Sequence, residues 1–105
     1  MNVQLKKGVL DLCVLRLLMD SPTYGYNIYQ KINDVMPISE STIYPILRKM
    51  VSEKWVTTSL ESSPDGPPRR YFKMTPLGVK TFDTLQSEWF TFNHQIQRIL
   101  GDESV

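Results

Sequence analysis

The sequence predicts a mainly α-helical fold with one small β-hairpin, and three observations support this class. Four segments either repeat apolar residues with a helical period or form an apolar run too long for a strand. Two short segments rich in β-branched and aromatic residues lie together between the third and the fourth of them. A chain of 105 residues has room for one small body built from these parts.

Charge and cysteine content limit the kind of charged partner and the cellular compartment that we expect for this protein. Net charge is +1, but residues 39–73 hold six bases and four acids, whereas the chain from residue 76 onward holds two bases and four acids. A strongly charged partner would therefore meet a local basic patch in the middle of the chain. Cys13 is the only cysteine, which excludes an intrachain disulfide and suits a reducing compartment. Charges interrupt the apolar stretch after Lys6 and Lys7, so we expect no signal peptide, no membrane span and a cytoplasmic protein.

Two helices are predicted before Pro37. Residues 8–19 are apolar on nearly every side, which predicts a buried helix with Cys13 as an inert thiol. Residues 24–36 repeat apolar side chains with the period of an amphipathic helix. Thr23 is a candidate for the N-cap of this helix, and Pro37 ends it.

A third helix is predicted over residues 40–53, with Ser39 as its N-cap and a distortion near its start at Pro45. One face is apolar and consists of Ile43, Leu47, Met50 and Val51. The opposite face is polar and basic and consists of Ser41, Thr42, Tyr44, Pro45, Arg48, Lys49 and Ser52. The pattern predicts a helix that packs on its own domain and presents hydrogen-bonding side chains outward.

Residues 55–61 and 70–74 are predicted to pair as a β-hairpin. The loop between them is longer than a hairpin needs, and its prolines limit its freedom. Arg69 and Arg70 are expected at the tip of this loop or just beyond it. Stiff loops lose little entropy when they dock, so the two arginines are candidates for an electrostatic contact.

The last helix is expected to begin at Pro76, with Thr75 as its cap, and to run for about 25 residues. Its apolar residues alternate in steps of three and four and are Phe82, Leu85, Trp89, Phe92, Ile96 and Ile99. Such a repeat is typical of a coiled-coil seam. The stripe either packs on the core of the same chain or, because the helix overhangs a small body, meets a second copy.

This order of elements is the plan of a winged helix-turn-helix followed by a long C-terminal helix. On this plan the polar face of residues 40–53 enters the major groove of DNA. The hydroxyls of Ser41, Thr42 and Tyr44 can then donate to phosphates, and Arg48 or Lys49 can reach guanine edges or the backbone. The alternatives are a solvated helix face and an ordinary polar hairpin loop.

Enzyme chemistry has little support in the residues. His94 is the only histidine and has no cysteine partner for a metal, so it is expected to be a solvated or interface residue. The glycines form no phosphate-binding loop, and no pair of acids has a spacing that suggests acid–base catalysis. We therefore expect no catalytic residues, no metal and no cofactor.

Three segments, taken together, resemble the PadR-type transcriptional regulators. They are "KKGVLDLCVLRLL…YGYNIYQKI", "STIYPILRKMVSEKWV" and "GPPRRYFKMTPLG", and the similarity runs from about Leu5 to Leu100. The resemblance implies a DNA-binding winged helix at residues 1–75 and a dimerisation helix with a short tail at residues 76–105. It also implies a homodimeric repressor that leaves a double-stranded, palindromic DNA operator when a small aromatic or planar effector binds.

Residue by residue, the resemblance assigns a groove-facing set and a pair of wing contacts. The groove-facing residues are Thr42, Tyr44, Pro45, Arg48 and Lys49, and the wing contacts are Arg69 and Arg70. Tyr24, Gly25 and Tyr26 match a family motif whose role is mainly structural, with a DNA contact as the alternative. The family commonly has glycine where this chain has Lys54, so the helix before it is expected to end differently.

A tryptophan at the position of Trp89 lines an apolar pore between subunits in some multidrug-sensing relatives. Phe82, Phe92 and Val9 could line the same space here, and the alternative is that Trp89 simply fills the dimer core. Two rival functions remain open on the sequence. One is a winged helix that binds protein without direct DNA binding, and the other is a small-ligand-binding protein or enzyme that works in this pore.

Overall fold

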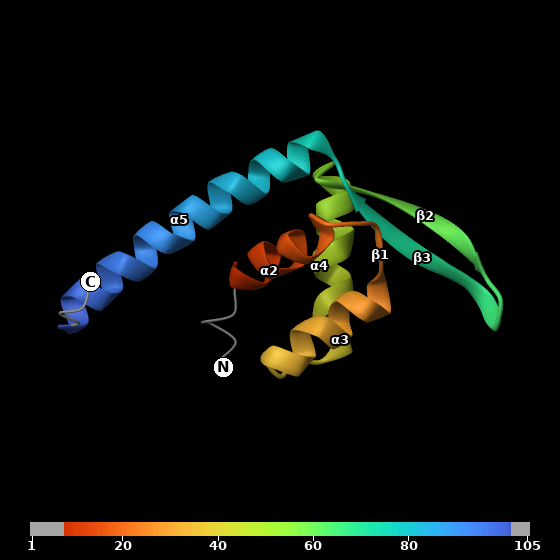
Figure 1. Ribbon diagram of the computed structural model, residues 1–105, viewed down its shortest axis with the longest axis horizontal. Helices are drawn as coiled ribbons and strands as arrows, with labels where there is room; N and C mark the ends of the chain where they lie inside the picture. The colour runs from red at the N-terminus through yellow and green to blue at the C-terminus, as the bar shows by residue number, and fades with distance from the viewer. Residues whose placement is uncertain (1–7, 102–105) are drawn as a thin grey trace.

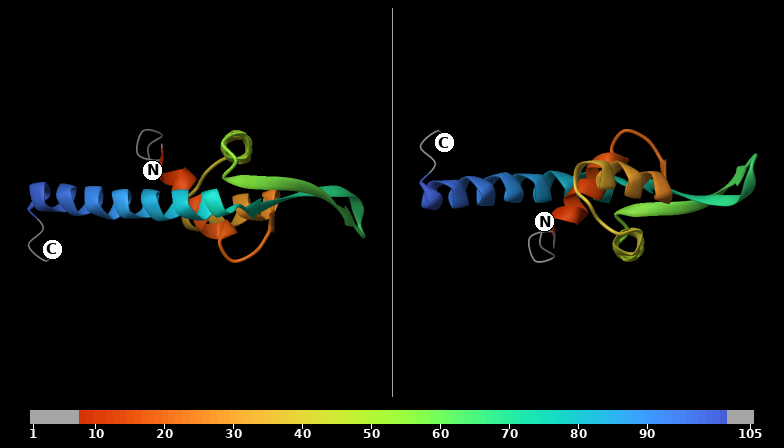
Figure 2. Two further views of the ribbon diagram at one scale, coloured as in Figure 1. Left: turned by 90° about the horizontal axis from the view of Figure 1, so that it is seen from above. Right: turned by 90° about the horizontal axis from the view of Figure 1, so that it is seen from below.

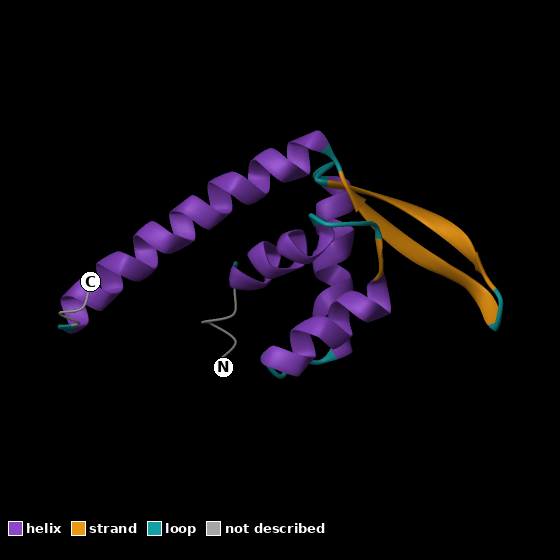
Figure 3. Ribbon diagram, in the orientation of Figure 1, coloured by secondary structure: helices purple, strands orange, loops and turns teal. Residues whose placement is uncertain are grey.

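The computed structural model of the protein describes residues 8–101. Its elements are α2 (Val9–Leu18), β1 (Thr23–Tyr24), α3 (Gly25–Val35), α4 (Glu40–Ser52), β2 (Val56–Ser63), β3 (Gly66–Met74) and α5 (Pro76–Leu100) (Figure 1). Lys6, Lys7 and residues 102–105 lie outside the described residues. The predicted class is confirmed: helices dominate, and one small antiparallel sheet accompanies them (Figure 3).

Helix α2 lies at the centre of the helical body, between α5 and the pair α3 and α4 (Figure 1). Val14 and Leu15 are fully buried, as expected for a helix that is apolar on nearly every side. The apolar stripe predicted on α4 points inward, because Ile43, Leu47 and Met50 are all at most 1% exposed. One member of the predicted α3 stripe differs: Val35, in the last turn, is 86% exposed.

The sheet has the strand order β1-β3-β2 and is larger than the sequence predicts. Strand β1 is a two-residue segment that pairs Thr23 with Phe72 and Tyr24 with Tyr71. Thr23 is therefore a strand residue and not the cap of α3, and its hydroxyl donates to the carbonyl of Ser21 (3.0 Å). The predicted cap is wrong because a tertiary pairing fixes the backbone just before the helix.

The β2–β3 hairpin also differs from its prediction. The connection is a tight turn at residues 64–65, and Pro67 and Pro68 belong to strand β3. The register shifts between Glu61 and Ser63, opposite the two prolines, so the sheet is irregular where they lack N–H donors. The long proline loop of the prediction is thus a continuation of the strands.

Two of the predicted helix ends agree in position with the structure. Thr75 caps α5, because its hydroxyl oxygen accepts the N–H of Gly78 (3.0 Å) and Pro76 occupies the first turn. Ser39 stands at the N-cap of α4, but its hydroxyl bonds the hydroxyls of Ser41 (2.9 Å) and Thr42 (3.0 Å) and caps no backbone N–H. Helix α4 runs through Pro45 as one helix.

The end of α4 corrects the expectation about Lys54. This residue adopts the left-handed conformation itself, with φ 65°. The N–H of Lys54 donates to the carbonyl of Val51 (3.0 Å) and that of Trp55 to the carbonyl of Met50 (2.9 Å). These two bonds are the Schellman ending that glycine usually supplies, so the lysine accepts the backbone strain and the helix ends in the usual way.

The molecule is elongated, with extents of 53 × 29 × 21 Å. Helix α5 extends from one side of the helical body and the β2–β3 hairpin from the other (Figures 1 and 2). The predicted α5 stripe is buried near its start, where Phe82 is 5% exposed, and is exposed in its second half, at Phe92 (55%), Ile96 (38%) and Ile99 (81%). The first half of the stripe therefore packs on the core of its own chain. The second half is uncovered and is free to meet a second copy.

Candidate nucleic-acid interface

The outward face of α4 carries most of the predicted groove-facing side chains. Ser41, Thr42 and Arg48 are exposed, because the apolar side chains of the same helix hold its other face in the core. Pro45 is exposed on this helix as well. The hydroxyls of Ser41 and Thr42 lie in the first turn of α4, the end of a helix that favours anionic groups such as phosphates.

Tyr44 lies half-buried where α4 meets the start of α3, with its ring against Gly25. Burial raises the pKa of its hydroxyl, and the nearby Glu40 carboxylate raises this pKa further. An ordinary tyrosine hydroxyl is protonated at neutral pH and can donate a hydrogen bond, and both effects act in the direction that keeps this proton.

Lys49 is placed differently from Arg48. Its ammonium group pairs with the carboxylate of Asp11 on α2 and lies 5.8 Å from the ring centroid of Trp55. The Asp11 side chain is only 14% exposed, so this ion pair ties α4 to the core helix α2. Much of the Lys49 charge is therefore neutralised within the chain.

Arg69 and Arg70 lie on strand β3, beyond the turn, and are both exposed. Adjacent residues in a strand point to opposite faces, and the two arginines have different partners. The guanidinium carbon of Arg69 lies 5.0 Å from the centroid of the Tyr24 ring. The guanidinium of Arg70 donates to the hydroxyl of Thr58 (3.2 Å).

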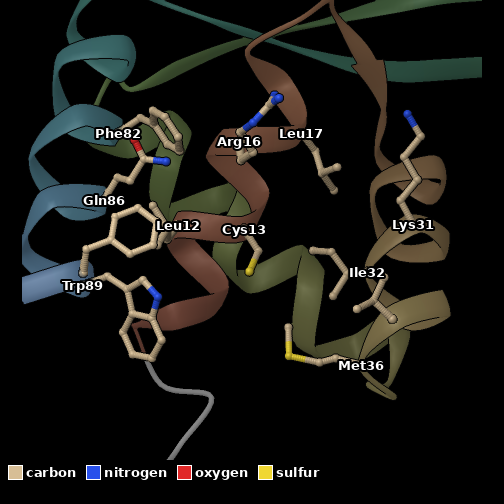
Figure 4. A pocket seen from close by; sticks show the side chains of 12 residues that line it. Leu12, Cys13, Arg16, Leu17, Lys31, Ile32, Met36, Phe82, Gln86 and Trp89 are labelled. Atoms are coloured by element: carbon tan, nitrogen blue, oxygen red, sulfur yellow. The ribbon is translucent and has the colours of Figure 1, made fainter. Parts of the chain in front are cut away.

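A cavity of about 360 Å³ lies between α2, α3 and α5 (Figure 4). Phe82 and Trp89, two of the predicted pore residues, lie in its wall, whereas Val9 and Phe92 are not among its lining residues. The wall is mostly apolar, with Arg16 as one of its few charged groups. Cys13 also lines the cavity and is half-buried, and burial raises the pKa of its thiol, which disfavours the reactive thiolate.

Comparison with known proteins identifies the family. The model of the transcriptional regulator PadR-like family matches residues 14–84. The chain belongs to the PadR-like family of transcriptional regulators. The family match makes it a DNA-binding regulator of transcription and not an enzyme.

Solved structures of transcriptional regulators, and one further relative, resemble most of the chain. A PadR-like transcriptional regulator from Bacillus cereus is 31% identical, with a TM-score of 0.82 over 95% of this chain and 99% of that one. A Streptococcus transcriptional regulator is also 31% identical, with a TM-score of 0.84 over 95% of this chain and 100% of that one. An uncharacterised protein of Lysinibacillus sphaericus is 31% identical over 87 residues, which are 79% of this chain and 80% of that one.

One feature of this candidate interface is not predicted from the sequence. All five tyrosines gather where the start of α3 meets α4 and β3. Tyr24 links the hairpin to α3 within this group, because its ring contacts those of Tyr26 (6.4 Å between centroids) and Tyr71 (5.9 Å). The resemblance to the family singles out Tyr24 and Tyr26, but the pairing of Tyr24 with Tyr71 depends on strand β1, which the sequence does not predict.

Residues 8–101 hold neither a metal-site cluster nor a membrane-spanning helix. Within that range no three histidine, cysteine or acidic side chains are grouped as a metal site would require. No helix in the same range is both long and apolar enough to cross a membrane.

Proposed function

We propose that this PadR-like regulator is a homodimeric repressor that grips a palindromic operator with helix α4 and the β2–β3 hairpin. The observation that carries the proposal is the division of α4 into a buried apolar face and an exposed face with Ser41, Thr42 and Arg48. The hairpin adds Arg69 and Arg70 as a second cationic contact on a separate element. In a helix-turn-helix protein such a helix enters the major groove while flanking elements contact the backbone.

The dimer is supported by the uncovered half of the α5 stripe. Isoleucine and phenylalanine side chains exposed in a row favour burial against a matching surface. A twofold dimer would present its two α4 helices about 34 Å apart, one turn of DNA, to the two halves of a palindrome.

Release by an effector is supported by the cavity at the root of α5. The rings of Phe82 and Trp89 give its wall flat apolar surfaces, which suit a small planar aromatic compound. A compound bound there would touch the helical body and α5 at once. It could thereby change the angle between the DNA-binding helices of a dimer. Val9 and Phe92 are proposed to border the same compound from the side of the second copy.

The DNA contact is tested by gel shift on the protein's own upstream region, with the double variant Arg69→Ala and Arg70→Ala. We expect binding to weaken about tenfold or more and the salt dependence to fall by about two counterions, because two phosphate contacts are lost. The matched control is Lys80→Ala, which removes an exposed base from α5 outside the interface. Equal binding by the wild-type and double-variant proteins would rule out the hairpin contact.

The effector is tested by Trp89 fluorescence in a Trp55→Phe background, titrated with planar aromatic compounds. We expect quenching together with release of the DNA probe, since the compound would stack on the indole ring. A full set of such compounds with no quenching would argue against an effector site at Trp89 and leave the DNA contact unaffected.

A further inference from the structure

Arg69 occupies an exposed position on a hairpin that extends away from the helical body (Figure 1). An arginine side chain free in water loses considerable rotamer freedom when it binds. In this molecule the guanidinium is already placed over the face of Tyr24, at 5.0 Å from the ring centroid. This distance is in the range of a cation–π contact.

Tyr24 is itself held from two sides. Its backbone pairs with Tyr71 of the hairpin, and it immediately precedes the first residue of α3. Its ring packs against those of Tyr71 and Tyr26, and Tyr26 in turn contacts Tyr29 (5.7 Å). A row of rings thus leads from the hairpin to the first turns of the helix-turn-helix.

We propose that Tyr24 is a positioning residue for DNA binding, which fixes the guanidinium of Arg69 before DNA arrives. Stacking uses the flat face of the guanidinium and leaves the N–H groups at its edge available for bidentate contact with a phosphate. The inference rests on the proposed contact between Arg69 and DNA. Arg70 has no such support, because its partner is the hydroxyl of Thr58.

The carboxylate of Glu61 is a neighbouring negative charge that competes with DNA for Arg69. Glu61 lies directly across from it in the β2–β3 register, and the Glu61 carboxylate accepts a hydrogen bond from the hydroxyl of Ser59 (3.1 Å). An arginine released from Tyr24 could turn to this carboxylate. The ring of Tyr24 therefore favours the conformation in which the guanidinium of Arg69 stays over the tyrosine ring and does not turn to Glu61.

The test is a double-mutant cycle on binding to a duplex that the wild-type protein selects from a random pool. We expect Arg69→Ala to weaken binding about tenfold, as loss of a charged hydrogen bond does. Tyr24→Leu should weaken binding about threefold in the wild-type background, the size of an exposed cation–π contact. The same change should have no effect in the Arg69→Ala background, because there is no guanidinium left to position.

Tyr24→Phe keeps the ring and is expected to restore the coupling with Arg69 that Tyr24→Leu removes. The matched control is the cycle between Tyr24→Leu and Arg70→Ala, in which the two effects should simply add. NMR of the free protein gives an independent readout. The ring current of Tyr24 should shift the Arg69 side-chain protons upfield, and the shift should vanish in Tyr24→Leu and persist in Tyr24→Phe.

Two results distinguish a failure of the positioning role of Tyr24 from a failure of the proposed contact between Arg69 and DNA. Wild-type affinity in Arg69→Ala would overturn the proposed contact between Arg69 and DNA, on which the inference rests. A tenfold loss in Arg69→Ala together with an equal effect of Tyr24→Leu in both backgrounds would leave the contact intact and overturn the positioning role. Tyr24 would then act on folding or touch DNA directly.

Discussion

At position 78 a single methyl group decides how helix α5 can dock. Gly78 is buried in the first turn, and a Cβ built on it would lie 2.0 Å from the backbone carbonyl oxygen of Trp55. Alanine normally stabilises a helix relative to glycine by about 1 kcal/mol. Here the clash is with backbone that cannot turn away, so we expect Gly78→Ala to lower the free energy of unfolding by about 2–3 kcal/mol. Urea denaturation followed by circular dichroism measures the change.

Gly66 provides the matched control, because a Cβ built there has no atom within 4 Å. Gly66→Ala should change the free energy of unfolding by less than about 0.5 kcal/mol. If Gly78→Ala proved as stable as the wild type, α5 could not approach the backbone of Trp55 as closely as the structure shows.

At the scale of elements, the helices were predictable and the sheet was not. Periodic apolar residues such as Ile43 and Leu47 identified α3, α4 and α5, and a continuous apolar run identified α2, because both patterns are local properties of the sequence. Strand β1 has two residues and therefore no period. Pro67 and Pro68 predicted a loop, yet β3 accommodates them beside an irregularity in its pairing with β2. Such strands are specified by partners distant in sequence.

The candidate site divides in the same way. The exposed face of α4 followed from its apolar stripe, whereas the partners of Lys49 and Arg69 lie on other elements and left no local signal. Asp11, the partner of Lys49, is 38 residues away in the sequence. Adjacent basic residues on one helix therefore have different environments, and the pattern of charges in the sequence does not reveal this difference.

Arg48 and Lys49 give a direct comparison on helix α4. Arg48 is exposed, whereas the ammonium of Lys49 pairs with Asp11. We expect Arg48→Met to weaken DNA binding several-fold and to reduce the salt dependence by about one counterion. Lys49→Met should affect DNA binding less and lower the free energy of unfolding by about 1 kcal/mol, since the half-exposed pair with Asp11 is lost. Fluorescence anisotropy at several salt concentrations, with thermal unfolding of both variants, measures the two effects. A larger binding defect in Lys49→Met would show that the Asp11 pair opens when DNA binds.

At the scale of the whole molecule, the shape separates the proposed DNA-contacting end from an uncovered apolar end. The hairpin and α5 extend in opposite directions from one small core (Figure 2). Ile96 and Ile99 are 38% and 81% exposed on the distal part of α5. Side chains of this kind gain about 1.5–3 kcal/mol each on full burial, and a twofold interface counts each of them twice.

We therefore expect Ile99→Lys to raise the dimer dissociation constant about a hundredfold or more. The measurement is light scattering coupled to size-exclusion chromatography over a dilution series. His94→Lys is the matched control, because this exposed residue lies on the same helix nearly opposite the stripe and gains the same charge. The monomeric variant should also lose affinity for a palindromic probe far more than for a single half-site, since two linked α4 helices no longer bind together. Dimers of unchanged stability in Ile99→Lys would place the subunit interface elsewhere on the chain, and the predicted one-turn spacing of the half-sites would lose its structural basis.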